Sequence, residues 1–153
     1  MSESIPFSPV PVDEEGVIHV SAVVLADGAG RVLQVRKSGT EAFMFPGGKP
    51  EAGETYLLAA VREVAEETAL TLAPSDLTCL GLRRTSAANE EGQALAAAVY
   101  AGPVLADDVA AAVTVHDEIE ELAWVSPSDV DEEGSFPGGR LAPLSVEVLR
   151  ERP

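Results

Sequence analysis

The stretch formed by residues 45–70 places the strongest constraint on the fold of this chain. Its first half contains Pro46, Gly47, Gly48, Pro50 and Gly53. Glycine frees the backbone dihedral φ and proline fixes it, so such a run interrupts both helices and strands. From Thr55 onward, apolar residues recur at helical spacing, and Thr55 itself is a typical helix N-cap. The sequence therefore predicts a loop that leads directly into a helix.

The predicted helix carries three carboxylates on one face. Glu63, Glu66 and Glu67 fall within an arc of about 100°. The opposite side carries Leu58, Val61 and Val64. Carboxylates at this spacing raise one another's pKa unless positive charge lies between them, and Arg62 or oxygen-coordinated divalent cations would supply it. Taken alone, three glutamates are more simply explained by a solvated acidic face.

The loop and the helix together resemble the Nudix box, in which Gly, Glu, Arg-Glu and Glu-Glu recur at long fixed spacings. The matching residues are Gly48, Glu54, Arg62, Glu63, Val64, Glu66, Glu67 and Leu70. The second glycine of the box is replaced by Ala69. Glycine commonly closes a helix in the left-handed conformation, which costs alanine roughly 1 kcal/mol. All the charged positions of the box are intact.

This resemblance implies a fold, an activity and a set of site residues. The implied fold class is α/β (α+β), a Nudix-type α/β/α sandwich with a mixed β-sheet and a loop-helix-loop box. The implied activity is metal-dependent hydrolysis of a pyrophosphate bond in a nucleoside diphosphate linked to another moiety, with Mg²⁺ or Mn²⁺ as cofactor. The implied catalytic residues are Arg62, Glu63, Glu66 and Glu67. The implied metal ligands are Gly47, Glu63, Glu66, Glu67 and Glu118.

Glu118 comes from an acidic cluster that precedes a predicted strand ending in Trp124 and Val125. In MutT-type members of the family, a metal-binding glutamate precedes a strand tryptophan at the spacing found here between Glu118 and Trp124. Glu120 and Glu121 lie closer to the strand and are expected to be surface charges. A surface position is the alternative for Glu118 as well.

Basic residues near the box are candidates for binding the phosphates of the substrate. In the family a basic residue before the box contacts phosphate, which selects Arg36 or Lys37, and Lys49 within the loop is a further candidate. Arg36 and Lys37 are equally compatible with ordinary charges at a strand end.

Two functional alternatives follow from the resemblance. The substrate of an enzyme would be a nucleoside triphosphate, a modified nucleotide or a nucleotide sugar. A Nudix-fold sensor or regulator would instead bind a nucleotide without turnover. A binder need not retain three mutually repelling carboxylates, so the sequence favours the enzyme.

Length and charge limit the organisation and the partners of the chain. With 153 residues the chain fits one domain, which we assign to residues 17–153, after a flexible, proline-interrupted arm at residues 1–16. A net charge of −16 argues against a nucleic-acid polymer or an anionic membrane as partner. We expect a cytoplasmic protein that binds a small nucleotide, and a homodimer is possible from the sequence. The single cysteine, Cys79, is expected to be a buried, inert thiol.

The remaining elements follow from hydrophobic runs and turn residues. Residues 17–25 and 31–37 are predicted to be a strand and its returning partner around a turn at Asp27 and Gly28. Residues 77–86 and 93–101 are predicted to form a hairpin, and residues 117–125 a strand. Residues 103–115 are expected to be a loop or a short irregular helix. Ser126 to Asp129 signal a very short helix, and residues 142–152 a closing one.

Overall fold

The computed structural model describes residues 9–11, 16–86 and 93–151. Most of the predicted arm at residues 1–16 and the predicted turn between residues 87 and 92 lie outside the described residues. Within the arm, the carbonyl of Pro9 accepts a hydrogen bond from the backbone N–H of Tyr56 at 3.1 Å. None of the described helices is long and apolar enough to cross a membrane.

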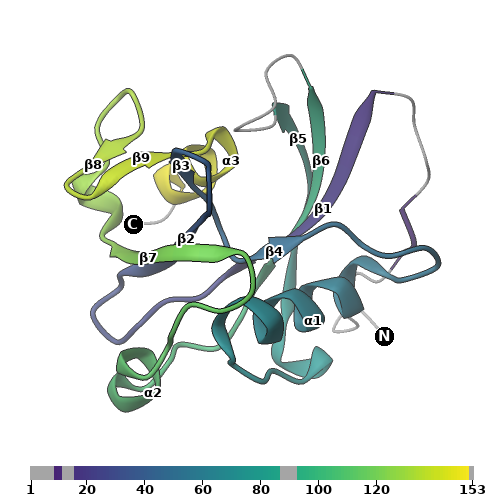
Figure 1. The fold of residues 1–153 in the computed structure, drawn as a ribbon, viewed down its shortest axis with the longest axis horizontal. Helices are drawn as coiled ribbons and strands as arrows, with labels where there is room; N and C mark the ends of the chain where they lie inside the picture. The colour runs from purple at the N-terminus through teal and green to yellow at the C-terminus, as the bar shows by residue number, and fades with distance from the viewer. Residues whose placement is uncertain (1–8, 12–15, 87–92, 152–153) are drawn as a thin grey trace.

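A mixed four-stranded sheet forms the centre of the fold (Figure 1). Its order is β4 (Gly47–Gly48), β1 (Val17–Val24), β6 (Ala94–Ala101) and β5 (Thr78–Ser86). β1 runs parallel to β6, while β4 pairs antiparallel with β1 and β5 pairs antiparallel with β6. The predicted hairpin of β5 and β6 is therefore confirmed.

Two smaller sheets lie beside the central one. β2 (Val32–Lys37) pairs antiparallel with β7 (Ile119–Val125). β9 (Gly139–Leu141) lies between β3 (Ala42–Phe43) and β8 (Ser135–Phe136). The helices are α1 (Tyr56–Thr68), α2 (Asp107–Ala111) and α3 (Pro143–Arg150), with short 3-10 turns at Pro74–Asp76 and Pro127–Asp129.

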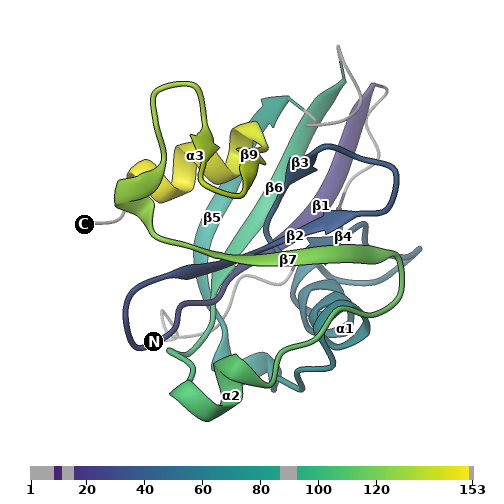
Figure 2. The same cartoon turned by 60° about the vertical axis from the view of Figure 1, so that its left-hand side comes forward.

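The core has two parts because side chains alternate across β1. Val23 packs with α1, whereas Ala22 and Val24 pack with residues of α3. The first part also contains Leu57, Ala60, Val64 and Tyr100. The second also contains Phe45, Val99, Leu144 and Val148. Helices α1 and α3 thus cover opposite faces of the central sheet, as Figure 2 shows, and the α/β/α arrangement is confirmed.

The predicted pairing of residues 17–25 with 31–37 is wrong beyond the turn. Asp27 does form the turn, because its buried carboxylate accepts hydrogen bonds from the backbone N–H groups of Ala29 and Arg31. The two strands then share only the bridge between Ala26 and Val32. Both edges of β1 are already occupied by β4 and β6, so β2 pairs with β7 instead.

Three smaller predictions also require correction. The glycine-rich loop is not wholly irregular, because Gly47 and Gly48 pair with Ala22 and Ser21 of β1. Leu58 is 49% exposed, since Leu57, Ala59 and Ala60 occupy the buried side of α1. Cys79 is half-buried, and its Sγ accepts a hydrogen bond from the backbone N–H of Gly81.

The beginning of α1 matches the prediction, and the structure settles the end that alanine in place of the box glycine had left open. The Thr55 hydroxyl oxygen accepts a hydrogen bond from the backbone N–H of Leu58 at 3.1 Å. Ala69 ends the helix at φ 62° and ψ 13°, and its N–H donates to the carbonyl of Ala65. Alanine therefore adopts the left-handed conformation that glycine favours.

Replacing Ala69 by glycine is expected to stabilise the protein by about 0.5–1 kcal/mol, because glycine has no Cβ strain at this dihedral. Ala65→Gly is the matched control: it lies on the exposed side of the same helix and should cost about 1 kcal/mol. Urea unfolding of both variants measures the difference. A loss of stability in Ala69→Gly would contradict this account of the helix end.

Candidate active site

The two glycines of β4 allow the loop to pack directly against the helix. A Cβ atom on Gly47 would collide with the backbone carbonyl of Ser21 in β1. A Cβ on Gly48 would lie 2.5 Å from the carboxyl carbon of Glu63. Position 47 therefore requires glycine, whereas a side chain at position 48 would displace the Glu63 carboxylate. The absence of side chains brings the carboxylates of α1 against the backbone of β4.

Glu67 is the most deeply buried carboxylate of the site, with only 1% of its surface exposed. Its Oε1 accepts a hydrogen bond from the backbone N–H of Gly47 at 3.1 Å. Its Oε2 is buried and has no hydrogen-bond partner among the described residues. Burial raises the pKa of Glu67 to about 8, and the nearby charges of Glu63 and Glu118 add to that effect. The side chain is therefore suited to hold a proton or a cation.

Arg62 organises the other carboxylates of the box. Its Nε and Nη2 donate to the two carboxylate oxygens of Glu54 at 2.9 and 2.8 Å. Its Nη1 donates to Glu63 at 3.0 Å and to Glu66 at 3.3 Å, and Nη2 also donates to the carbonyl of Lys49. The hydrogen bonds from Arg62 lower the pKa of Glu54, whereas burial raises the pKa of Glu63. The guanidinium is thus the positive charge expected between the glutamates.

Glu54 has a role that the sequence analysis did not assign. Its carboxylate fixes the Arg62 side chain through two hydrogen bonds and also accepts one from the backbone N–H of Glu51. It thereby joins the loop to the helix. Its match to a glutamate of the box was the one sign in the sequence of such a role, but only the folded loop shows that Glu54 faces Arg62.

The structure separates the two adjacent basic residues of β2. Lys37 lines a pocket beside β4, and its charge partly offsets the rise that burial causes in the pKa values of Glu63 and Glu67. Arg36 does not line this pocket. Its guanidinium donates to Glu121 at 2.9 Å and to the carbonyl of Thr40 at 2.9 Å. Neighbouring residues of a strand point to opposite faces, so only one of the two can reach the site.

The acidic cluster at the beginning of β7 is also divided between the site and the surface around Arg36. The Glu118 carboxylate lies 3.8 Å from the Lys37 ammonium, and its charge contributes to the raised pKa of Glu67. Glu120 and Glu121 pair with Arg36 and are more than half exposed. The left-handed backbone of Asp117, with φ 57°, immediately precedes Glu118. All three glutamates are about half exposed and differ in their partners: Glu118 lies with Lys37 and acts on Glu67, and the other two lie with Arg36.

The donor atoms of this site suit a hard divalent cation. Carboxylate and carbonyl oxygens are the ligands that Mg²⁺ and Mn²⁺ prefer, and the partnerless Oε2 of Glu67 is such a donor. Across the described ranges, no three acidic, histidine or cysteine side chains converge on one point. Arg62 and Lys37 account for this, because they draw Glu63, Glu66 and Glu118 toward their own charges. A cation would compete with these two side chains for the carboxylates.

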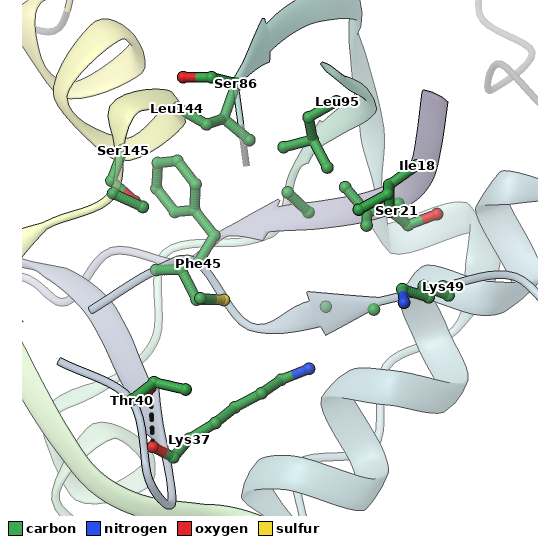
Figure 3. A pocket seen from close by; sticks show the side chains of 16 residues that line it. Ile18, Ser21, Lys37, Thr40, Phe45, Lys49, Ser86, Leu95, Leu144 and Ser145 are labelled. Carbon is green, nitrogen blue, oxygen red and sulfur yellow. Dashed lines mark hydrogen bonds between the residues drawn. The ribbon is translucent and has the colours of Figure 1, made fainter. Parts of the chain in front are cut away.

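A cavity of about 190 Å³ opens next to β4 (Figure 3). Lys37 and Lys49 lie at the β4 side of this cavity, and the Lys37 side chain extends toward the loop that carries Lys49. The ring of Phe45 faces α3, from which Leu144 and Ser145 project. The cavity is thus continuous with the glycine loop and close to the carboxylates of α1.

A glycine loop held against a glutamate-bearing helix, on a mixed sheet covered on both faces, defines a Nudix-type domain. The family model described as the NUDIX domain matches residues 17–144. The chain therefore belongs to the NUDIX family.

Relatives and solved structures agree with this assignment. An RNA pyrophosphohydrolase of Halorhodospira halophila is 41% identical over 73 residues, which are 48% of this chain and 39% of that protein. The chain thus spans well under half the length of this curated relative. An isopentenyl-diphosphate Delta-isomerase of Cutibacterium acnes is 29% identical over 136 residues, covering 82% of this chain and 68% of that protein. The MutT NUDIX hydrolase of Burkholderia pseudomallei shares the fold, with a TM-score of 0.69 at 20% identity over 90% of this chain and 98% of its own.

The buried carboxyl of Glu67 is expected to make stability depend on pH in metal-free buffer. Its folded-state pKa of about 8 lies above the ordinary 4.5, so the native state binds this proton more tightly than the unfolded chain. The resulting stabilisation is complete below pH 4.5 and is lost as the pH rises through 8. Glu67→Gln lacks this group, so the Tm of the wild type should fall relative to that of the variant between pH 4.5 and 8.5. Parallel Tm profiles in EDTA would contradict the burial argument.

Proposed function

We propose that this chain hydrolyses a pyrophosphate bond in a nucleoside diphosphate linked to another moiety. The observation that carries the proposal is the buried Glu67 carboxylate, with one oxygen on the Gly47 amide and the other without a partner among the described residues. A solvated acidic face, the simplest alternative, would not bury a glutamate to 1% exposure. The name of the RNA pyrophosphohydrolase relative supports a pyrophosphate as the group that is cleaved.

The side chains divide the chemical work. Mg²⁺ or Mn²⁺, held by Glu63, Glu66, Glu67, Glu118 and the backbone of Gly47, would neutralise phosphate charge and lower the pKa of an attacking water. Lys37 and Lys49, at the cavity beside β4, bind the phosphate oxygens. Arg62 holds Glu54, Glu63 and Glu66 in place. A carboxylate of the box, with the buried Glu67 as the candidate, accepts the proton that the water loses.

A non-catalytic sensor or regulator is the second reading of the same fold. The NUDIX domain of Shewanella oneidensis NrtR, solved with ADP ribose, shares the fold at a TM-score of 0.65 and 16% identity over 87% of this chain. Several carboxylates clustered around one guanidinium favour turnover, because simple binding of an anion would be opposed by them. The net charge of −16 supports a small nucleotide over a nucleic-acid polymer. A cytoplasmic location and a homodimer stay predictions.

Turnover is expected to need a divalent cation and the Glu67 carboxylate. EDTA should abolish phosphate or nucleotide release, and Mg²⁺ or Mn²⁺ should restore it. Glu67→Gln should lower kcat by about 10²–10⁴-fold without lowering Tm, because glutamine keeps the volume but loses the proton acceptor and the charge. Glu133→Gln, an exposed acid outside the box, is the matched control. Full activity in EDTA, or in Glu67→Gln, would refute the mechanism.

Glu118 and Glu120 provide a paired test of the ligand outside the box. Glu118→Gln should raise the Mg²⁺ concentration needed for half-maximal rate and lower kcat, because it faces Lys37 and Glu67. Glu120→Gln should leave both values near those of the wild type, because it only pairs with Arg36 at the surface. Metal titrations of the two variants make the comparison. Small and equal effects would remove Glu118 from the ligand set.

A further inference from the structure

The cavity beside β4 is mainly apolar, although it adjoins a highly charged site. Its walls come from β1, the loop around β4, the beginning of β6 and α3, with Lys37 at the end of β2 and Ser86 at the end of β5 (Figure 3). The large apolar side chains that line it are Ile18, Val20, Met44, Phe45, Leu95 and Leu144. Among the described lining residues, no carboxylate, carboxamide, imidazole or indole is present. The walls therefore offer contact area and few directional polar groups.

Three of the hydroxyls in the lining already use their protons inside the protein. The Ser21 hydroxyl donates to the carbonyl of Tyr56 at 2.6 Å. The Thr40 hydroxyl donates to the carbonyl of Lys37 at 2.8 Å, and the Ser145 hydroxyl donates to the buried carboxamide oxygen of Gln34 at 2.6 Å. A hydroxyl has only one proton to donate. These three groups therefore cannot donate a hydrogen bond to a ligand in the cavity.

A nucleobase is poorly matched to such walls. Its amide, amine and ring nitrogen groups would lose hydrogen bonds to water without receiving a complementary set from the protein. Arg140 of β9 does not line the cavity; its guanidinium lies 3.7 Å from the carboxylate of Glu41, and its side chain is mostly exposed. An aliphatic group needs no hydrogen bonds and gains free energy from each methylene removed from water.

We propose that the moiety linked to the nucleoside diphosphate is an apolar aliphatic group and that it occupies this cavity. Lys37 and Lys49 hold the diphosphate at the side next to β4, and the nucleoside lies outside the cavity. The proposal rests on the pyrophosphate hydrolysis proposed above and narrows its substrate class. In the reaction, water adds its oxygen to one phosphorus and the bridging P–O bond breaks. The products are a nucleoside monophosphate and an alkyl phosphate, and the two protons of water are shared between the new phosphate oxygen and the medium.

The test is a series of adenosine diphosphate n-alkyl esters from methyl to octyl, with AMP release measured at saturating Mg²⁺. Each methylene that enters the cavity should raise kcat/KM about fourfold, until the cavity is filled. ADP-ribose and ATP serve as substrates with polar moieties and should be cleaved less efficiently than the hexyl ester. Non-hydrolysable analogues with a methylene between the phosphorus atoms should show the same trend in Kd.

A pair of variants locates the effect in the cavity. Leu95→Asn places a polar side chain in the wall and should flatten the dependence on chain length. Leu82→Asn, on the neighbouring strand β5 and outside the cavity lining, is the matched control and should keep the wild-type slope.

The outcomes separate this inference from the proposed hydrolysis. AMP release with kcat/KM independent of chain length, or with ADP-ribose preferred over the longer esters, would overturn the apolar moiety and leave the hydrolysis in place. Lack of AMP release from every compound would overturn the hydrolysis. In that case the Kd series still decides the inference, because an increase in affinity with chain length supports it and a flat series refutes it.

Discussion

The contact between the Gly47 amide and the Glu67 carboxylate is the interaction on which this site depends. A carboxylate with 1% exposure and a single hydrogen bond is costly to keep charged, which its pKa of about 8 reflects. The contact forms where β4 pairs with β1, and Gly47 can approach Ser21 of β1 so closely because it has no side chain. The hydroxyl of Ser21 in β1 also donates to the carbonyl of Tyr56, where α1 begins. Strand, loop and helix are thus fixed together around one buried acid.

Arg62 complements the buried Glu67 by holding the three carboxylates of the box that lie nearer to solvent. It makes two hydrogen bonds to Glu54 but only one each to Glu63 and Glu66, at 3.0 and 3.3 Å. A cation that takes Glu63 and Glu66 would therefore leave the stronger Glu54 pair intact. Arg62 would still join the loop to the helix, so the site can exchange ion pairs for metal ligands without loss of its framework. This separation of anchoring from ligation is a reason for the box to retain four glutamates.

The sequence predicted elements whose signals are local and missed features that depend on packing. The N-cap at Thr55 and the hairpin of β5 and β6 follow from short-range chemistry, and both were predicted. The end of the helix at Ala69 was left open, because alanine stands where the box has glycine. The exposure of Leu58 was missed because Leu57, of the same size, and two small alanines occupy the buried side of α1 in its place. The partner of β2 was missed because strand pairing depends on which edges are free. The sequence could not choose between Arg36 and Lys37 as the phosphate-binding candidate, because it does not show which of the two side chains points toward the site.

The cavity that we propose for the apolar moiety is lined in part by an element that does not contribute to the carboxylate cluster. Glu63, Glu66 and Glu67 belong to α1, on one side of the central sheet, whereas Leu144 and Ser145 of the cavity wall belong to α3, on the other side. The buried Gln34 of β2 accepts the Ser145 hydroxyl and so fixes the position of that wall. Substitutions in α3 can therefore reshape the cavity while the contact between Gly47 and Glu67 stays unchanged. Proteins that share one chemical motif can in this way differ in substrate through changes in the opposite layer of the sandwich.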